Sequence, residues 1–211
     1  MNTVITIGRQ FGSYGHEIGE KLAAKLNIPF YDKELITRVA KESGYCEELI
    51  LSNDEKPTNS FLYNLVMDTY SFGYNSSSFV DMPISHKVFL AQFDTIKKIA
   101  SEGPCVIVGR CADYALADFD NVLNIFIYAN EEFKIKGILE HDETKKLTKS
   151  KAKDLFLKKD KQRASYYNYY SSKKWGHADT YDLCIDSSIL GIDGTVNLIK
   201  QYIEDFEKKK N

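Results

Sequence analysis

Glycines and polar residues follow a short apolar run near the start of the chain, in an order that suits phosphate binding. Val4–Ile7 is uncharged and mostly β-branched, and the residues from Gly8 to Gly15 read Gly-Arg-Gln-Phe-Gly-Ser-Tyr-Gly. Apolar residues at helical spacing follow, which indicates a strand, a tight turn and a helix. Such a turn aims backbone N–H groups and the positive helix end at an anion, although the same glycines suit any strand-to-helix turn. We predict a phosphate or sulfate site on the amides of Gly12 to His16.

A carboxylate stands at the end of the next short strand. Asp32 closes the run Asn27–Asp32, a turn that leads into a strand. Ligands of open α/β sheets bind at the carboxyl ends of strands, so Asp32 would face the same crevice as the glycine turn. It would equally serve as the N-cap of a helix over Lys33–Ser43. Both interpretations stay open.

Two later segments have unusual composition. Residues 142–163 contain nine Lys or Arg against four acidic residues. This run is either a solvated helix face or a hinged lid whose cations meet polyphosphate. Tyr166–Gly176 is dense in aromatic rings, which would pack on a partner subunit, stack on a base or cover the domain. We expect Tyr166–Trp175 to lie in a homodimer contact.

These residues must be positioned by strands and helices that alternate along the chain. Further apolar runs typical of buried strands are Cys105–Val108, Val122–Ala129 and Leu183–Ile185. Helical spacing is found in Glu47–Leu51, Phe61–Thr69, Ile84–Ser101, Glu131–Glu140, Lys149–Tyr170 and Ile192–Glu207, with a polar-aromatic loop at Tyr70–Phe79. Alternation of this kind predicts an α/β fold with a parallel sheet of about five strands.

Composition narrows the class of protein. The chain has 211 residues, a hydrophobic content of 43% and a formal net charge of −2, which fits one globular domain and gives no electrostatic reason to expect nucleic acid or an anionic membrane as partner. The four cysteines lack metal-type spacing and suit a reducing compartment. No apolar run reaches membrane-spanning length and no signal-peptide pattern is present, so we expect a cytoplasmic protein.

With the glycine turn, Tyr31–Leu35, Ile107–Arg110 and Asp160–Arg163 together, the chain resembles the cytidylate kinase-like family of P-loop nucleoside monophosphate kinase relatives. The resemblance implies a three-layer α/β P-loop fold over residues 1–211, with acceptor-binding helices at about 33–100 and a lid at about 142–163. It also implies transfer of a phosphoryl group from ATP, with Mg²⁺, to CMP, dCMP or a similar acceptor.

The resemblance also assigns roles to residues. The donor ATP would lie on the P-loop, with Ser13 as the metal ligand, and the acceptor and lid would supply the catalytic residues. The P-loop set is Arg9, Gly12, Ser13, Tyr14, Gly15, His16 and Glu17, and the catalytic set is Asp32, Arg110, Lys161 and Arg163.

The P-loop departs from the usual pattern. A Walker A motif ends in Gly-Lys-[Ser/Thr], with the Lys on the β- and γ-phosphates. Here the corresponding residues are Gly15, His16 and Glu17, and the loop from Gly8 is two residues longer. Cys111 stands after Gly-Arg, where cytidylate kinases have an acid.

Two other functions compete with a kinase. A non-catalytic nucleotide-binding or regulatory protein would explain the missing Lys. A short-chain dehydrogenase would use the glycines as a dinucleotide turn and Asp32 on a ribose, with Tyr169 and Lys173 as its Tyr-x-x-x-Lys pair.

Overall fold

The computed structural model describes residues 2–55 and 82–210, so the predicted helix Phe61–Thr69 and loop Tyr70–Phe79 lie outside the described residues. Its centre is a five-stranded sheet in the order β2-β3-β1-β4-β5, with every neighbouring pair parallel. The strands are β1 Val4–Arg9, β2 Phe30–Tyr31, β3 Val106–Val108, β4 Val122–Tyr128 and β5 Leu183–Asp186. The predicted α/β fold is confirmed.

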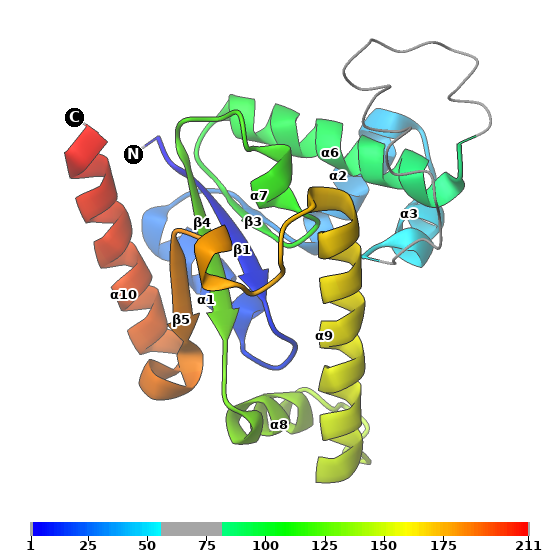
Figure 1. Ribbon diagram of the computed structural model, residues 1–211, viewed down its shortest axis with the longest axis vertical. Coiled ribbons are helices and arrows are strands. Elements are labelled where there is room, and N and C mark those ends of the chain that lie inside the picture. The colour runs from blue at the N-terminus through cyan, green and yellow to red at the C-terminus, as the bar shows by residue number, and fades with distance from the viewer. Residues whose placement is uncertain (1, 56–81, 211) are drawn as a thin grey trace.

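Helices connect the strands and cover both faces of the sheet (Figure 1). Their bounds are α1 Gly15–Leu26, α2 Lys33–Ser43, α3 Glu47–Asn53, α6 Ile84–Glu102, α7 Ala112–Ala115, α8 Glu131–Glu140, α9 Lys149–Ser171 and α10 Ser187–Lys210, with a 3₁₀ turn at Ala178–Thr180. Gly191 interrupts α10 with φ 65°, so the regular part begins at about the predicted Ile192. The described residues contain no helix long and apolar enough to cross a membrane.

One face of the sheet packs against α1 and α10. Alternate side chains of the strands, such as Ile5 and Ile7 of β1, point to this side and are fully buried. They meet Ile18 and Leu22 of α1 and Ile199 of α10, the apolar faces that the helical spacing marked out. This packing holds α1 against β1, and the glycine turn connects these two elements.

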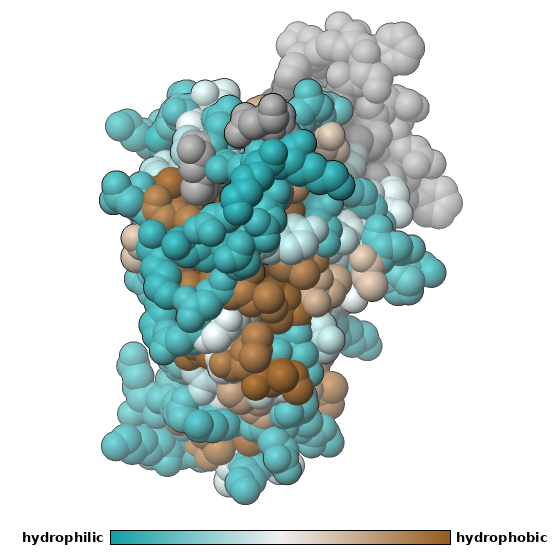
Figure 2. All heavy atoms as spheres, turned by 90° about the vertical axis from the view of Figure 1, so that its left-hand side faces the viewer, coloured by the Kyte–Doolittle hydropathy of each residue, from teal (hydrophilic) through white to brown (hydrophobic). Residues whose placement is uncertain are grey.

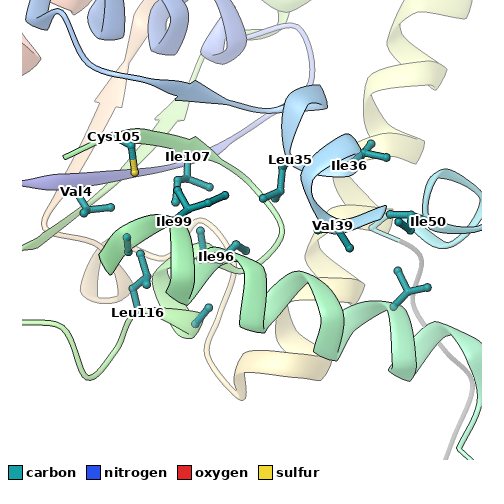
Figure 3. Packing of buried hydrophobic residues seen from close by; sticks show 14 residues of the cluster. Val4, Leu35, Ile36, Val39, Ile50, Ile96, Ile99, Cys105, Ile107 and Leu116 are labelled. Atoms are coloured by element: carbon teal, nitrogen blue, oxygen red, sulfur yellow. The ribbon is translucent and has the colours of Figure 1, made fainter. Parts of the chain in front are cut away.

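The opposite face packs against α2, α6 and α7. Figure 3 shows Ile107 of β3, Leu35 of α2 and Ile99 of α6 gathered between the sheet and these helices. Ile50 of α3 joins the far end of the same cluster and is fully buried. This packing brings the chain that follows α3 to the sheet edge where the strands end.

The tyrosines of α9 cover the remaining part of this face. Tyr166, Tyr167 and Tyr170 are at most 5% exposed and pack with Phe126 of β4 in one aromatic cluster. Tyr170 stacks on Phe89 with ring centroids 3.8 Å apart. Of the interpretations of this segment, the structure favours the one in which the rings cover the domain, because a single chain already buries them. The homodimer stays a prediction without support from these three rings.

The face that carries α10 is the one turned to the viewer in Figure 2, where hydrophobic atoms emerge between hydrophilic ones. Several large apolar residues of α10 are exposed there, the most open being Ile189 at 75%. The others on this helix are Leu190, Leu198 and Tyr202. Scattered exposed apolar residues are ordinary on globular proteins.

Replacing Phe126 by Ala should lower the free energy of unfolding by about 3–5 kcal/mol, because a fully buried aromatic ring leaves a cavity. Its ring contacts those of Trp175 and Tyr181 at centroid distances of 5.1 and 5.0 Å. Urea unfolding followed by circular dichroism measures the change. The control Leu198→Ala, on the exposed side of α10, should stay within about 0.5 kcal/mol of the wild type. Equal effects of the two variants would contradict this account of the core.

Candidate functional site

The glycine turn joins the end of β1 to the start of α1 and adopts left-handed backbone angles. Gly12 has φ 81°, and a Cβ on it would lie 2.6 Å from the carbonyl oxygen of Lys134, so this position has no room for a side chain. Tyr14 caps α1 at φ 58° and makes no side-chain capping hydrogen bond within the described residues. The first amides of α1 have no carbonyl partner inside the helix, and they stand at the positive end of its dipole. The turn therefore has the backbone geometry of an anion site.

A groove with a volume of about 470 Å³ lies over this turn. Figure 1 shows α8 and α9 beyond the carboxyl ends of β1 and β4, and both helices contribute to the groove. Its charged and ionisable lining residues are Arg9, His16, Glu17, Asp32, Lys33, His141, Asp142 and Arg163. A volume of this size suits a nucleotide-sized ligand.

Some predicted P-loop side chains have other partners. Ser13 is fully buried, and its hydroxyl donates to the carbonyl oxygen of Gln10 at 2.8 Å. Glu17 Oε1 lies 2.7 Å from His141 Nε2, and this contact joins α1 to the end of α8. The Tyr14 hydroxyl donates to Glu140 of α8. These contacts shape the groove wall and engage the side chains of Ser13, Tyr14 and Glu17 within the protein.

Asp32 precedes α2 in the N-cap position, but its side chain makes no capping bond in the described structure. One carboxylate oxygen lies 2.7 Å from His16 Nδ1, and the other accepts Arg110 Nη1. Burial would raise the pKa of Asp32, but the charges of Arg110 and Arg9 outweigh burial and lower it. Of the two open interpretations, the geometry favours the crevice. His16 lines the groove while Asp32 holds its Nδ1.

Arg110 is held between carboxylates. Its side chain is 5% exposed, and it donates from Nε and Nη2 to both oxygens of Asp54 at 3.2 and 2.9 Å. Nη1 donates to Asp32 and to the carbonyl oxygen of Val108. Burial would lower the pKa of Arg110, but Asp54 and Asp32 raise it. Arg110 therefore connects the end of β2 to the chain after α3, and it is not among the lining residues of the groove. The contacts seen position these segments, and the predicted role of Arg110 in acceptor binding stays a prediction.

Glu55 belongs to this site although no sequence pattern pointed to it. Its carboxylate lies 2.7 Å from Arg9 Nη1 and 3.1 Å from Arg163 Nε. Arg9 comes from β1 and Arg163 from α9, so the pairing spans 46 and 108 positions of sequence. Gly109 makes room for this contact, since a Cβ there would lie 2.6 Å from Glu55 Oε1 and also against Arg9. Neither Asp54 nor Glu55 belongs to a spacing pattern that predicts such contacts.

The two cations predicted for the lid differ in whether they reach the groove. Arg163 lines the groove, whereas Lys161 is exposed and lies outside the lining. Asp160, between them in the predicted run, accepts the backbone N–H of Phe11 at 2.7 Å and pairs with buried Lys134 at 3.6 Å. The basic run is therefore mostly a solvated face, with one arginine and one aspartate turned to the P-loop.

The described side chains do not fit a protein-held Mg²⁺. The hydroxyl of Ser13, the expected ligand, donates a hydrogen bond to the carbonyl oxygen of Gln10, and Glu17 is paired with His141. In the part of the chain that the structure describes, no group of three His, Cys, Asp or Glu side chains is poised to hold a metal ion.

Comparison with known proteins identifies the relatives of this chain. The model of the cytidylate kinase-like family matches residues 4–189. An uncharacterised protein from Eubacterium ventriosum ATCC 27560 has a similar structure, with a TM-score of 0.73 and 31% identity over 97% of this chain and 99% of the other. The curated proteins contain no match.

More distant structures share the fold. Shikimate kinase from Bacteroides thetaiotaomicron aligns with a TM-score of 0.56 and 12% identity over 97% of this chain and 99% of its own. A gluconokinase from Sinorhizobium meliloti 1021 aligns with a TM-score of 0.52 and 10% identity over 100% of this chain and 98% of its own. Together with the family match, they show a kinase-like P-loop fold.

Asp32→Asn should destabilise the protein at neutral pH, and the deficit should shrink in acid. The lowered pKa of folded Asp32 lies under the unfolded value of about 3.9, so the charged form stabilises fully above that pH and its contribution is lost as the pH falls through the folded pKa. Urea unfolding of both proteins from about pH 7 to pH 3 measures the difference. Asp193→Asn, at an exposed pair with Lys21, is the control and should show a far smaller deficit. A deficit independent of pH would contradict the ion pairing.

Proposed function

The chain belongs to the cytidylate kinase-like family, and we propose that it is an ATP-dependent phosphotransferase acting on CMP, dCMP or a close analogue. One observation carries the proposal: the groove brings the open amides of α1 together with Arg9, Arg163 and the His16–Asp32 pair. Phosphoryl transfer needs phosphates held in line and their charge compensated, with little covalent work for the protein.

The donor phosphates would lie on the backbone of the turn. The amides at Gly15 and His16 face an anion along the helix dipole, and backbone donors cost no side-chain ordering. His16 stands where most P-loops have Lys, and Asp32 orients its ring. In the transfer, an acceptor phosphate oxygen bonds to the γ-phosphorus of ATP while the bond from that phosphorus to the β,γ-bridging oxygen breaks.

The two arginines of the groove would compensate the charge of the transferred group. Arg9 is fixed at the end of β1 and Arg163 comes from α9, and both contact the same carboxylate, Glu55. We assign residues 142–163 as the lid and α2, α3 and α6 as the acceptor side. A homodimer and a cytoplasmic location remain predictions.

Magnesium is expected with ATP, but the described side chains offer it no ready ligand, and we assign none of them to it. No step of the proposed transfer is assigned to the ion.

A non-catalytic nucleotide-binding or regulatory protein is the second candidate. The observation in its favour is that Arg9, Arg110 and Arg163 are all engaged by carboxylates while a histidine replaces the P-loop Lys. Such a protein would bind ATP at the turn without transferring its phosphate.

Arg163→Ala should lower kcat/KM about 10²–10³-fold, the effect typical of losing one preorganised electrostatic donor. A coupled assay with ATP and Mg²⁺ over CMP, dCMP, UMP and AMP provides the rates. Lys208→Ala is the control, because Lys208 is exposed on α10, outside the groove lining and the assigned lid, and should leave the rate unchanged. If the wild type turns over but both variants match it, Arg163 has no part in transfer.

His16→Lys should raise activity and tighten ATP binding by about tenfold, because Lys places a permanent positive charge where the donor phosphates are expected. The same coupled assay and an ATP titration measure both effects. His16→Gln, which keeps a polar group without the charge, should show no gain. If the wild type transfers to no monophosphate and His16→Lys changes neither quantity, the proposed mechanism is wrong.

A further inference from the structure

The Glu55 carboxylate occupies a position built like an oxyanion site. Its Oε1 lies 2.7 Å from Arg9 Nη1 and 3.5 Å from the backbone N of Arg110, and its Oε2 lies 3.1 Å from Arg163 Nε. Two guanidinium groups and a backbone amide thus converge on one anion. This donor set is the one that proteins use for phosphate as well as for carboxylate.

The same two arginines also line the groove over the glycine turn. Arg9 and Arg163 border both the 470 Å³ groove and a small internal cavity of about 20 Å³ that Glu55 helps to line. Of these two spaces, Glu55 lines the internal cavity, and the two arginines are shared between that cavity and the groove. A phosphate group that bound the two arginines from the groove would compete with Glu55 for the same guanidinium groups.

Charge makes joint occupancy unfavourable. Burial would raise the pKa of Glu55, but Arg9, Arg163 and Arg110 outweigh burial and hold it well below its usual range, so the carboxylate stays ionised. Asp54 and Asp32 already engage Arg110 from the other side, so the arginines and carboxylates balance in number. Adding phosphate to this cluster would place an excess of negative charge in a poorly solvated site.

Glu55 is also the carboxylate best placed to leave. It follows the end of α3 at Asn53 and has a φ of 48°, a left-handed angle that is uncommon for a residue other than glycine. Asp32, by contrast, stands directly at the start of α2 and is held by both His16 and Arg110.

We propose that the Glu55 side chain occupies the position of a substrate phosphate group between Arg9 and Arg163, and that phosphate displaces it. The free protein is then self-inhibited by its own carboxylate. This inference rests on the proposed function, because the anion expected in the groove is a phosphoryl group of its substrates. The competing interpretation is an ion pair that only stabilises the fold, and the two predict opposite changes in anion affinity.

The test is Glu55→Gln, which keeps the shape of the side chain and removes its charge. Inorganic phosphate, titrated by calorimetry, should bind the variant about tenfold more tightly than the wild type. Trp175, the only tryptophan of the chain, lines the internal cavity with Glu55 and Arg9, so its fluorescence provides a second signal. Asp54→Asn is the matched control, since Asp54 engages Arg110 instead, and it should not tighten phosphate binding.

Unchanged or weaker phosphate binding in Glu55→Gln would overturn the proposal and leave Glu55 as a structural ion pair. Equal tightening in Asp54→Asn would overturn it too, because a general gain of positive charge would then explain the effect. Should Glu55→Gln fail to fold, Glu55→Asp replaces it: the shorter acid keeps its charge but reaches the arginines less well. Phosphate should then bind several-fold more tightly than in the wild type, and no tightening would refute the displacement.

Phosphate binding is measured without ATP and without turnover, so the two proposals fail separately. Tighter phosphate binding in Glu55→Gln without transfer to any monophosphate would sustain the displacement and refute the kinase. Transfer by the wild type without tighter binding in the variant would do the reverse.

Discussion

Three arginines that are mostly withdrawn from water, from three different parts of the chain, constrain this structure. An arginine does not give up its charge in a protein, and a buried charge without a partner is costly, so each must meet an anion. Arg9, Arg110 and Arg163 meet Asp32, Asp54 and Glu55. Because the partners come from β1, the end of β3, α9, the end of β2 and the chain after α3, these ion pairs fix the glycine turn, the α2–α3 side and α9 relative to one another.

The apolar core makes this convergence possible. Parallel strands end on one edge of the sheet, so the residues that follow β1, β2 and β3 meet there whatever their separation in sequence. The clusters on the two faces hold α1 behind the turn and α2, α3 and α6 beside it. The aromatic cluster then fixes α9 through its tyrosines, which brings Arg163, three residues before Tyr166, to the groove.

Local sequence patterns predicted most of the strands and helices. The features that they missed depend on contacts between residues far apart in the sequence. β-branched runs predicted the strands, helical spacing predicted α1, α2, α8 and α9, and the glycines predicted the turn between β1 and α1. The anion site on that turn stays a prediction. Glu55 could not be found in this way, because its partners lie 46 and 108 positions away and no spacing relates them. Ser13 was expected to bind a metal ion through its hydroxyl. In the structure that hydroxyl donates to the carbonyl oxygen of Gln10, a contact within the loop that residue types alone do not predict. The composition of the tyrosine-rich segment suits packing on a partner, stacking on a base or covering the domain, and it does not tell which of these surfaces lies opposite the rings.

The ionic cluster also determines how a ligand would gain affinity. An anion that enters a site already neutralised by carboxylates gains only the difference between its own contacts and those that it replaces. A lone phosphate would therefore gain little from Arg9 and Arg163, whatever the strength of each contact. A larger ligand also gains from contacts that no internal group makes, such as the open amides of α1 and the rest of the groove wall. The ion pairs lost are the same for a phosphate fragment and for a whole substrate, so the carboxylate lowers both affinities equally, and the contacts elsewhere in the groove are what distinguish the two ligands.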